Sequence, residues 1–438
     1  MTDSNFSKVA VVGSGIAGLS AAWHLAQSGR VQVTLFESEP RAGGHAHTVD
    51  ITVAGKTFPV DTGFLVFNHK TYPGLTPFLE QLGVPTVPSD MGFSVQVGKY
   101  LEWAGNGLSS VFTQRKNLLS LRFWRMLRDM LRFNKAATRF ALAPPNTTQT
   151  LGEYLVVNGY SAQLRDWYLI PMAAAIWSCP TETMLAYPMA TFSRFCHNHG
   201  LLQITNRPQW YTVQGGSREY VRKVLETLLN KGCELHLGLA VTRIERAPSA
   251  GNGGVTVHTA AGVESFEAIV VATHSDQALR LLDAPTANEQ RILGAIRYQP
   301  NRAVLHTDSS VLPTHPRAWA AWNYETQSGD VNPSGQRVCL HYLLNKLQPL
   351  PVGGETPVVV SLNPLREINP AQVIQTFDYD HPVFDSGAIA AQQALPSIQA
   401  NRVGGGVWFA GAWANYGFHE DGFQSGLTAA RGVLKALD

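Results

Sequence analysis

The feature that most constrains the fold is a glycine-rich turn near the N-terminus. The apolar run Lys8–Val12 has strand character and leads into Gly13-Ser-Gly15-Ile16-Ala17-Gly18, after which the apolar spacing becomes helical. The first glycine permits a tight turn, the second lets backbone approach a pyrophosphate, and the third lets helix and strand pack closely. Since a phosphate would sit at the helix N-terminus, the pattern predicts a Rossmann-type dinucleotide site that includes Ile16 and Ala17.

An acidic residue follows at the distance that such a site needs. The second predicted strand, residues 31–36, ends at Glu37, about twenty residues after the last glycine of the turn, where a carboxylate accepts hydrogen bonds from a ribose diol. The chain then continues through Ser38 and Arg41 to the pair Gly43-Gly44 and His45. The glycine pair lets more backbone lie against a diphosphate, so these residues are predicted cofactor contacts.

Two later segments favour FAD over NAD as the cofactor. The turn Thr62-Gly63-Phe64 is predicted to bring backbone to the isoalloxazine ring. Near the C-terminus a predicted strand ends at Gly411-Ala412, and Asp421-Gly422-Phe423 lies at the start of a helical run. A helix N-terminus at that place would offer N–H groups and a positive dipole to the pyrimidine oxygen of a reduced flavin.

Taken together, these motifs resemble the flavin-containing amine oxidase and phytoene desaturase superfamily. The resemblance covers the first ninety residues, the block from Val213 to Thr273 and the last thirty residues, and it does not extend closely to the middle of the chain. Within the superfamily the chain looks most like bacterial predicted amine-oxidase-like FAD oxidoreductases linked to modified fatty acids. The resemblance implies that Val241 contacts the adenine side of the cofactor.

Three departures from the family pattern refine the expected chemistry. His45 replaces an arginine that many amine oxidases carry after the glycine pair. No cysteine follows Cys339, so the family's covalent flavin attachment has no candidate residue and FAD is expected to bind non-covalently. A second G-x-G-x-x-G is also missing, so electrons are expected to come from the substrate and to leave to dioxygen or a quinone.

The predicted fold class is α/β, with a discontinuous, glutathione-reductase-like Rossmann-type FAD-binding domain and an inserted α+β substrate domain. The FAD-binding domain is assigned to residues 1–85, 206–273 and 400–438. The substrate-binding domain is assigned to residues 86–205 and 274–399. A chain of 438 residues with 45% hydrophobic side chains is long enough to bury two such cores.

The candidate catalytic residues lie beside the C-terminal motif. His419 adjoins the predicted flavin-facing helix start, where an imidazole can exchange a proton. Trp413 and Tyr416 occupy places where amine oxidases set aromatic side chains facing the flavin. Ordinary packing is the alternative for both aromatic residues, and an N-cap is the alternative for Asp421. Four other polar side chains offer weaker alternatives. His45 and His47 could contact the diphosphate or act near the flavin, and Lys346 and His306 could replace the family's flavin-proximal lysine.

Aromatic residues in the middle of the chain favour an apolar substrate. Such a supply suits a long apolar tunnel better than a polar amine pocket. The leading hypothesis is therefore an FAD-dependent dehydrogenase, desaturase or oxidase that acts on a lipid-like or other small apolar molecule. A flavin amine oxidase is the first rival, and a non-redox flavin-binding partner or an isomerase is the second. The aromatic residues are Trp167, Tyr168, Trp177, Phe192, Phe195, Trp210, Tyr211, Trp319, Trp322 and Tyr324.

Composition excludes several other classes of protein. A net charge of only +2 argues against nucleic-acid binding. The four cysteines (Cys179, Cys196, Cys233 and Cys339) have no C-x-x-C spacing, so no metal site is predicted and they are expected to be buried thiols. The first eight residues are polar, and the longest nearly uncharged apolar stretch is too short to cross a bilayer, so a cytoplasmic protein is expected. The oligomeric state is left open.

One segment is strongly basic. Residues 113–139 carry a net charge of +7, and the rest of the chain carries −5. The spacing predicts an amphipathic helix with one cationic face and an apolar face formed by Leu119, Phe123, Met126, Met130 and Phe133. The plain interpretation is a surface helix whose basic side chains are solvated or paired with the acidic remainder. The alternative is peripheral contact with an anionic membrane at its inner face.

Overall fold

The structure is a computed structural model that describes residues 6–142, 149–177, 184–203, 207–246, 254–326, 339–399 and 406–438. Cys179 and the predicted domain boundaries at residues 206 and 400 lie outside these ranges, as does the side chain of Trp177. The other three cysteines are free and buried, as expected.

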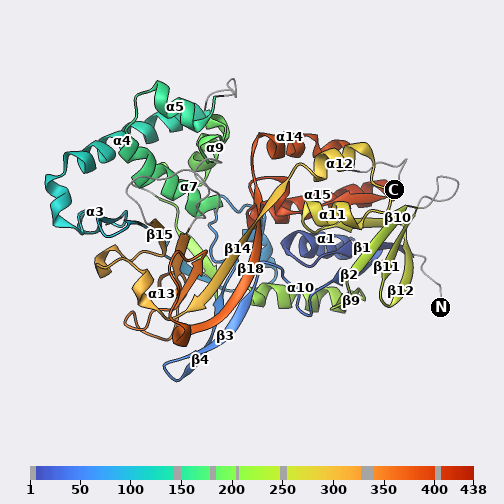
Figure 1. The fold of residues 1–438 in the computed structure, drawn as a ribbon. Coiled ribbons are helices and arrows are strands. Elements are labelled where there is room, and N and C mark those ends of the chain that lie inside the picture. Colours follow the sequence, from blue (N-terminus) through green and yellow to red (C-terminus); the bar gives the residue numbers. More distant parts are fainter. Residues whose placement is uncertain are drawn as a thin grey trace.

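A five-stranded parallel sheet with the strand order β19-β13-β1-β2-β9 forms the base of the cofactor-binding half (Figure 1). Its strands come from four separate parts of the chain, so segments far apart in sequence share one sheet. This arrangement confirms the predicted Rossmann-type α/β fold, although the exact domain boundaries stay a prediction. The strands are β1 (Ser7–Val12), β2 (Val31–Glu37), β9 (Glu234–Leu237), β13 (Ala268–Val271) and β19 (Val407–Phe409).

Alternation along β1 places this sheet between two layers. Val9 and Val11 point to a helical layer, whereas Ala10 and Val12 point to a three-stranded antiparallel sheet. All four side chains are buried, as successive residues of a strand covered on both faces should be. The helices are α1 (Ile16–Gln27), α10 (Arg218–Asn230) and α15 (His419–Ala436), and the antiparallel strands are β10 (Val241–Arg246), β11 (Val255–Thr259) and β12 (Gly262–Phe266).

A seven-stranded mixed sheet with the order β18-β14-β17-β16-β15-β6-β7 dominates the other half of the molecule. Its long strands β14 and β18 run along each other from this half to the junction with the cofactor-binding half (Figure 1). The strands are β6 (Phe93–Val97), β7 (Leu101–Ala104), β14 (Arg297–His306), β15 (Trp322–Thr326), β16 (Cys339–Leu343), β17 (Val359–Leu362) and β18 (Val373–Val383).

Shorter elements connect these layers or lie beside them. Two small antiparallel pairs, β3 with β4 and β5 with β8, lie close to the junction. They are β3 (Thr48–Val53), β4 (Lys56–Asp61), β5 (Thr86–Ser89) and β8 (Trp210–Val213). The accompanying helices are α2 (Leu75–Gln81), α11 (Ser275–Leu281), α12 (Ala287–Leu293), α13 (Leu344–Leu347) and α14 (Ser386–Ala394).

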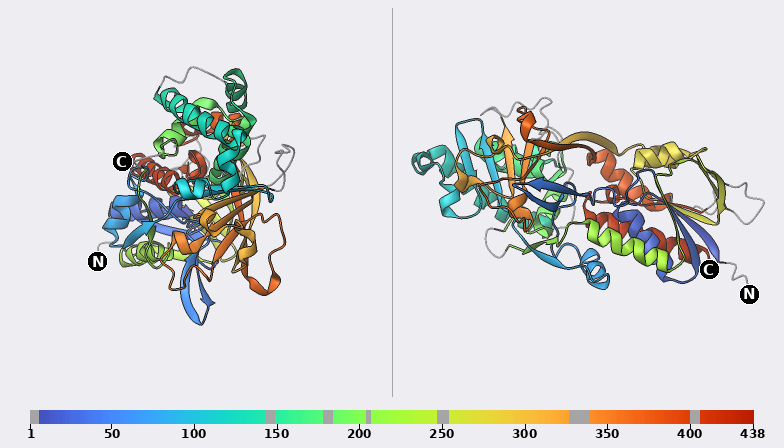
Figure 2. Two further views of the ribbon diagram at one scale, coloured as in Figure 1. Left: turned by 90° about the vertical axis from the view of Figure 1, so that its left-hand side faces the viewer. Right: turned by 90° about the horizontal axis from the view of Figure 1, so that it is seen from below.

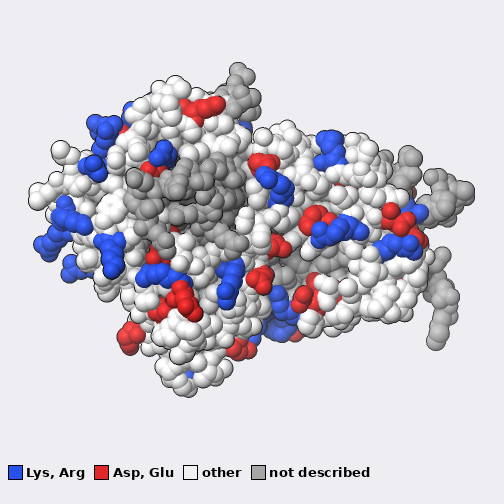
Figure 3. All heavy atoms as spheres, in the orientation of Figure 1, with Lys and Arg blue, Asp and Glu red and all other residues white. Residues whose placement is uncertain are grey.

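A group of helices forms the end of the molecule farthest from the parallel sheet (Figure 2). Lys and Arg side chains gather over this end (Figure 3). The elements are α3 (Leu108–Val111), the short 3-10 helix η1 (Arg115–Leu119), α4 (Leu121–Leu142), α5 (Leu151–Val157), α6 (Ala162–Leu164), the π-helical turn η2 (Arg165–Leu169), α7 (Ile170–Trp177) and α9 (Met189–Asn198).

The predicted amphipathic helix is present, with one correction. Phe123, Met126 and Phe133 are buried on one face of α4, as expected. Leu119 was wrongly placed on that face, because the chain forms η1 before α4 begins and leaves this side chain 90% exposed. Asp129, the one acidic residue of α4, is buried, and its carboxylate accepts a hydrogen bond from the backbone N–H of Ser161.

Close packing of α1 against its neighbours joins the two ends of the chain. A Cβ atom on Gly18 would overlap the carbonyl oxygen of Gly13, and one on Gly426 of α15 would overlap the carbonyl oxygen of Ala17. The Ser20 hydroxyl donates a hydrogen bond across the same interface to the carbonyl of Phe423, at 2.8 Å. The absence of side chains at these glycines therefore sets the separation of α1 from β1 and from α15.

We expect Gly426→Ala to destabilise the fold by about 1 to 3 kcal/mol, the usual range for overpacking a core. The added methyl group forces α15 away from α1, so the amount of bound flavin should fall as well. Chemical denaturation together with the flavin-to-protein absorbance ratio measures both effects. The matched control is Gly354→Ala, because Gly354 is exposed and its Cβ would meet no atom within 4 Å. Equal stability of the two variants would contradict this account of the interface.

Within the described ranges, no helix combines the length and the apolar character that crossing a bilayer requires.

Candidate functional site

A cavity of about 680 Å³ extends from the parallel sheet to the mixed sheet. The first part of the cavity is lined by the glycine-rich turn and by Glu37. Its far part is lined by apolar side chains of the half that contains the mixed sheet. Ala17, Ser38 and Val241 also line the first part. The sequence motifs for cofactor binding therefore meet at one cavity, although they lie in three separate regions of the chain.

The glycine-rich turn has the shape that a bound diphosphate needs. No atom lies within 4 Å of the place where a Cβ on Gly15 would be, and Gly15 lines the cavity in front of α1. Glu37 fixes this turn, because its Oε2 accepts hydrogen bonds from the backbone N–H and the hydroxyl of Ser14, at 2.8 and 2.6 Å. Its Oε1 accepts another from the N–H of Glu39. The carboxylate thus holds the loop and borders the space where a ribose would lie.

The glycine pair completes the same cradle. Gly44 has a positive φ of 56° and approaches the backbone of Gly15. Gly43 also has a positive φ, and a Cβ there would come within 2.6 Å of the carbonyl oxygen of Ala46. The Arg41 side chain does not line the cavity but donates a hydrogen bond to the carbonyl of Gly44, at 3.0 Å. Arg41 and Gly43 therefore shape the turn from outside.

The turn Thr62-Gly63-Phe64 lines the cavity and is held by a buried carboxylate, Asp61. Asp61 accepts hydrogen bonds from the hydroxyls of Thr48 and Ser217 and from the side-chain amide of Gln348. Burial raises the pKa of Asp61 to about 6, although these hydrogen bonds oppose the shift. The side chain of Asp61, the residue directly before the turn, thereby joins three chain segments. Sequence reasoning missed this role.

The C-terminal motif supplies the opposite wall. Gly411 and Ala412 line the cavity, and so do Gly417, Phe418 and His419 at the start of α15. The N-terminus of an 18-residue helix therefore lies at the cavity, where its dipole favours negative charge.

The rest of that motif has a packing role. Asp421 caps α15 by accepting a hydrogen bond from the N–H of Phe418, and burial raises the pKa of Asp421 to about 7. A Cβ on Gly422 would come within 2.7 Å of Ile16, and the Phe423 ring packs against Phe78. Asp421, Gly422 and Phe423 do not line the cavity, and neither does Gly18.

His419, Trp413 and Tyr416 all line the cavity, and hydrogen bonds hold the side chains of His419 and Trp413 in place. The Tyr220 hydroxyl lies 2.7 Å from His419 Nε2, and the imidazole stacks on Phe64 with ring centroids 3.8 Å apart. Burial lowers the pKa of His419 to about 3, so this side chain is neutral at pH 7 and a weak base. Trp413 is 2% exposed and donates a hydrogen bond to the carbonyl of Thr273. Their catalytic roles stay predictions.

Three side chains that sequence reasoning missed lie around His45, and a fourth aromatic ring packs against one of them. Tyr379 and His381 of β18 lie with ring centroids 5.1 and 5.7 Å from His45, and His274 stacks on Tyr298. Burial lowers the pKa of His45 to about 3 and that of His381 to about 4. His45 Nε2 is buried and has no hydrogen-bond partner among the described residues, which fits a site whose polar partner is a bound cofactor. No local pattern marks these residues, because strand pairing brings them together.

The weaker sequence candidates lie elsewhere. His47 Nδ1 is 2.9 Å from the hydroxyl of Tyr379, next to the cavity wall. Lys346 pairs with Asp90 at the surface, and His306 Nε2 lies 2.7 Å from the hydroxyl of Ser361. Neither Lys346 nor His306 is among the described residues that line the cavity.

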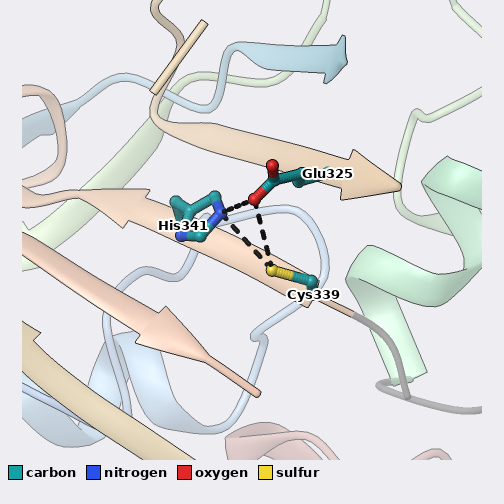
Figure 4. A group of neighbouring side chains, drawn as sticks. All are labelled: Glu325, Cys339 and His341. Atoms are coloured by element: carbon teal, nitrogen blue, oxygen red, sulfur yellow. Dashed lines mark hydrogen bonds and ion pairs between the residues drawn. The ribbon is translucent and has the colours of Figure 1, made fainter. Parts of the chain in front are cut away.

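A separate buried cluster on β15 and β16 contains three possible metal ligands, which the spacing of the cysteines did not indicate (Figure 4). His341 Nε2 lies 3.0 Å from Glu325 Oε2 and 3.4 Å from Cys339 Sγ. The remaining groups are already satisfied, since Arg366 pairs with Glu325 Oε1 at 2.9 Å and Ser361 Oγ lies 2.6 Å from His341 Nδ1. We interpret the cluster as a buried ion-pair network that supports the mixed sheet.

Comparisons with known proteins agree with this geometry. A family model described as flavin containing amine oxidoreductase matches residues 16–320. A carotenoid phi-ring synthase of Streptomyces griseus is 35% identical over 138 residues, which are 30% of this chain and 25% of that protein. The chain thus matches about a quarter of that relative's length.

Solved structures show the same fold over the whole chain. A cyclohexylamine oxidase from Brevibacterium oxydans has a TM-score of 0.66 at 17% identity, covering 99% of both chains. A CLA-producing fatty acid isomerase from P. acnes has a TM-score of 0.66 at 14% identity, covering 98% of both chains. At these identities the likeness concerns the fold alone.

We expect Glu37→Ala to weaken flavin binding by roughly 1 to 3 kcal/mol, the scale of a lost charge-assisted hydrogen bond. The substitution removes both the ribose acceptor and the carboxylate that holds Ser14 in place. Titration of flavin into the stripped protein measures the affinity. Glu39→Ala, which removes an exposed carboxylate two residues away, is the control and should bind as the wild type does. Wild-type affinity of Glu37→Ala would remove Glu37 from the site.

The buried ion pair predicts a pH dependence of stability. Burial alone would lower the pKa of His341, but Cys339 and Glu325 raise it to about 9. Because this value exceeds the value of about 6.5 for an unfolded histidine, protonated His341 stabilises the fold fully below pH 6.5. That stabilisation disappears as the pH rises towards 9.

The measurement is the unfolding free energy of the wild type and of Glu325→Gln between pH 6 and pH 9. The variant should be less stable by about 3 to 5 kcal/mol at pH 6, the usual cost of breaking a buried pair, and the difference should shrink as the pH rises. EDTA should leave the melting temperature unchanged. A large drop in melting temperature on chelation would instead identify the cluster as a metal site.

Proposed function

Because the chain belongs to the flavin-containing amine oxidoreductase family and is thus a flavin-dependent oxidoreductase, we propose that it binds FAD non-covalently and oxidises an apolar, lipid-like substrate. The observation that carries the proposal is the single cavity that joins the dinucleotide cradle to an apolar chamber.

The residues around the cavity fit an FAD molecule. Gly13, Gly15 and the N-terminus of α1 would hold the diphosphate, and Glu37 and Val241 would lie beside the adenosine half. Thr62-Gly63-Phe64 and the start of α15 would enclose the flavin ring, with the unpartnered nitrogen of His45 nearby. When bound, FAD accepts a hydride from the substrate and passes the electrons to dioxygen or a quinone.

The far part of the cavity favours an uncharged carbon chain. Its walls include Met172, Ile176 and Phe195 from α7 and α9, and Trp322 and Leu362 from the mixed sheet. Asp380 is the one carboxylate besides Glu37 among the described residues that line the cavity, and it is exposed. An ammonium group buried in this chamber would lack an anionic partner, which is costly. An amine oxidase activity is therefore the less favoured candidate.

The protein's own side chains would orient the substrate and exclude water. The histidines that line the cavity include His45, His199, His381 and His419, and burial lowers the pKa of each to about 3 or 4. These imidazoles are uncharged at pH 7 and hold no proton to donate as a strong acid. Such walls suit removal of a hydride from a carbon atom, in which the cofactor takes the electrons and the protein supplies shape.

An isomerase is the second candidate. The fatty acid isomerase named above has the same fold and by its name acts on a fatty acid, which agrees with the apolar chamber. An isomerase changes its substrate without net reduction of the flavin. Product analysis under anaerobic conditions separates the two activities.

The test measures anaerobic reduction of the flavin through the loss of its visible absorbance. The acyl probes are linoleate and a linoleoyl phospholipid, and the amine probes are cyclohexylamine and putrescine. We expect bleaching with an acyl probe, little with the amines, and slow reduction by NADH or NADPH. Denaturation should release intact FAD. Amine-driven bleaching with peroxide release would favour the amine oxidase, and isomerised product without bleaching would favour the isomerase.

A cavity-filling variant adds a structural control. Ala175 is 4% exposed and lines the apolar chamber, so Ala175→Trp should slow reduction by an acyl probe at least about tenfold, which corresponds to roughly 1.4 kcal/mol in the barrier. Flavin content should be unchanged. Ala371→Trp places the same side chain at an exposed position and should react as the wild type does. Equal rates for both variants would show that the substrate does not enter this chamber.

A further inference from the structure

Exposed apolar side chains are concentrated at the helical end of the molecule. Of the sixteen large hydrophobic residues that are exposed in the described part of the chain, seven lie between Leu108 and Leu142, so this short stretch holds nearly half of them. Leu108, Leu119 and Leu121 are 80 to 90% exposed. Leu118, Trp124 and Leu131 are about half exposed. We call the exposed side chains of α3, η1 and α4 the helical-end surface.

The same surface is strongly cationic. All eight basic residues of η1 and α4 are exposed, whereas the single acidic residue, Asp129, is 1% exposed and lies near Arg128 and Arg132. The other six have no ion-pair partner among the described residues: Arg115, Lys116, Arg122, Arg125, Lys135 and Arg139. Most of this positive charge is therefore not paired with acidic side chains of the described residues, and Lys and Arg side chains gather over this end of the face in view (Figure 3).

Trp124 fixes apolar and basic groups next to each other. Its indole N–H donates a hydrogen bond to the carbonyl of Leu118 at 2.9 Å, and its ring packs against Phe112. The first turn of α4 is thereby held against η1, and both elements carry exposed leucines and exposed basic residues. A half-exposed tryptophan beside leucines and arginines is the composition of helices that lie in the headgroup region of a bilayer.

We propose that the helical-end surface binds the anionic headgroups of a phospholipid bilayer, with its exposed leucines inserted among the acyl chains. Basic residues alone would also suit nucleic acid or an acidic protein. Nucleic acid offers nothing that would take up several fully exposed leucines, whereas a bilayer accommodates both kinds of side chain. Contact of this kind is peripheral, since none of the described helices can span the membrane.

The surface is also coupled to the walls of the cavity. α4 packs against α9 through Phe133 and Phe192, whose ring centroids are 6.3 Å apart. Phe195 of α9 and His199, which directly follows this helix, line the cavity. A lipid substrate collected at the bilayer would thus meet the same group of helices that encloses the apolar chamber. This last link rests on the proposed function, but the binding itself does not.

Cosedimentation of the flavin-loaded protein with vesicles tests the proposal. The probes are phosphatidylcholine vesicles with and without phosphatidylglycerol, at low and high ionic strength. We expect binding to the anionic vesicles that decreases with salt, and weak binding to the neutral ones. The variant Arg115→Gln/Lys116→Gln/Arg122→Gln/Arg125→Gln should bind at least about tenfold more weakly, because each basic residue near an anionic surface contributes about a fivefold factor.

The matched control removes four exposed basic residues from the cofactor-binding half: Lys231→Gln/Arg291→Gln/Arg431→Gln/Lys435→Gln. This variant should bind as the wild type does, and both variants should keep their full flavin content. No sedimentation at low salt, or equal loss in both variants, would overturn the proposal. Cosedimentation does not measure flavin reduction. A negative result would therefore leave the proposed oxidation of an apolar substrate intact, and failure of that oxidation would leave the proposed bilayer contact intact.

A second pair of variants tests the apolar contribution. Leu119→Ser/Leu121→Ser removes two side chains that make little contact with the fold, and it should weaken binding to anionic vesicles at high salt, where electrostatic attraction is screened. Leu229→Ser/Val263→Ser changes two exposed residues elsewhere and should have no effect. Wild-type binding by the first pair would restrict the contact to charge alone and contradict insertion.

Discussion

The structure depends on how closely α1 can approach its neighbours. Gly18 lets this helix rest on β1, and Gly426 lets α15 rest on α1, with backbone atoms in contact where side chains would normally intervene. The first consequence is that the glycine-rich turn and the start of α15, which are about four hundred residues apart in the chain, border one cavity. The second is that both helices direct their N-termini to the same space, where two positive dipole ends suit an anionic cofactor.

Burial then determines the chemistry available around that space. The imidazoles of His45, His381 and His419 are desolvated, and each has a pKa far below its usual value. Two carboxylates beside that space, Asp61 and Asp421, hold a turn and cap a helix and do not line the cavity. A cavity built in this way has few charges of its own, which leaves the redox step to the cofactor and selection of the substrate to shape.

The cofactor half could be predicted from the sequence because its signals are local. The glycine turn, Glu37 and the C-terminal motif each occupy one short segment, so spacing alone reveals them. Tyr379 and His381 were missed because only the pairing of β18 with β14 brings them to His45. The contact of Glu325 with Cys339 and His341 likewise depends on the register of β15 and β16. Leu119 was misplaced because helical periodicity was extended across Ser120, where the chain changes from η1 to α4.

Surface charge is distributed differently in the two halves of the molecule. The cofactor half pairs many of its surface charges, as in Arg218 with Asp50 and Arg280 with Asp276. In α4, by contrast, Asp129 is turned inward and accepts a hydrogen bond from the backbone of Ser161, so the only acid of the helix anchors it. Asp129 lies near Arg128 and Arg132, whereas Arg122, Arg125, Lys135 and Arg139 have no ion-pair partner among the described residues. An exposed Asp129 would have reduced the positive electrostatic potential of the helical-end surface, and it would not have anchored the helix. A fold that buries the one acid of this segment and exposes its leucines meets both requirements of the proposed contact with a bilayer, which are unpaired positive charge and free apolar side chains.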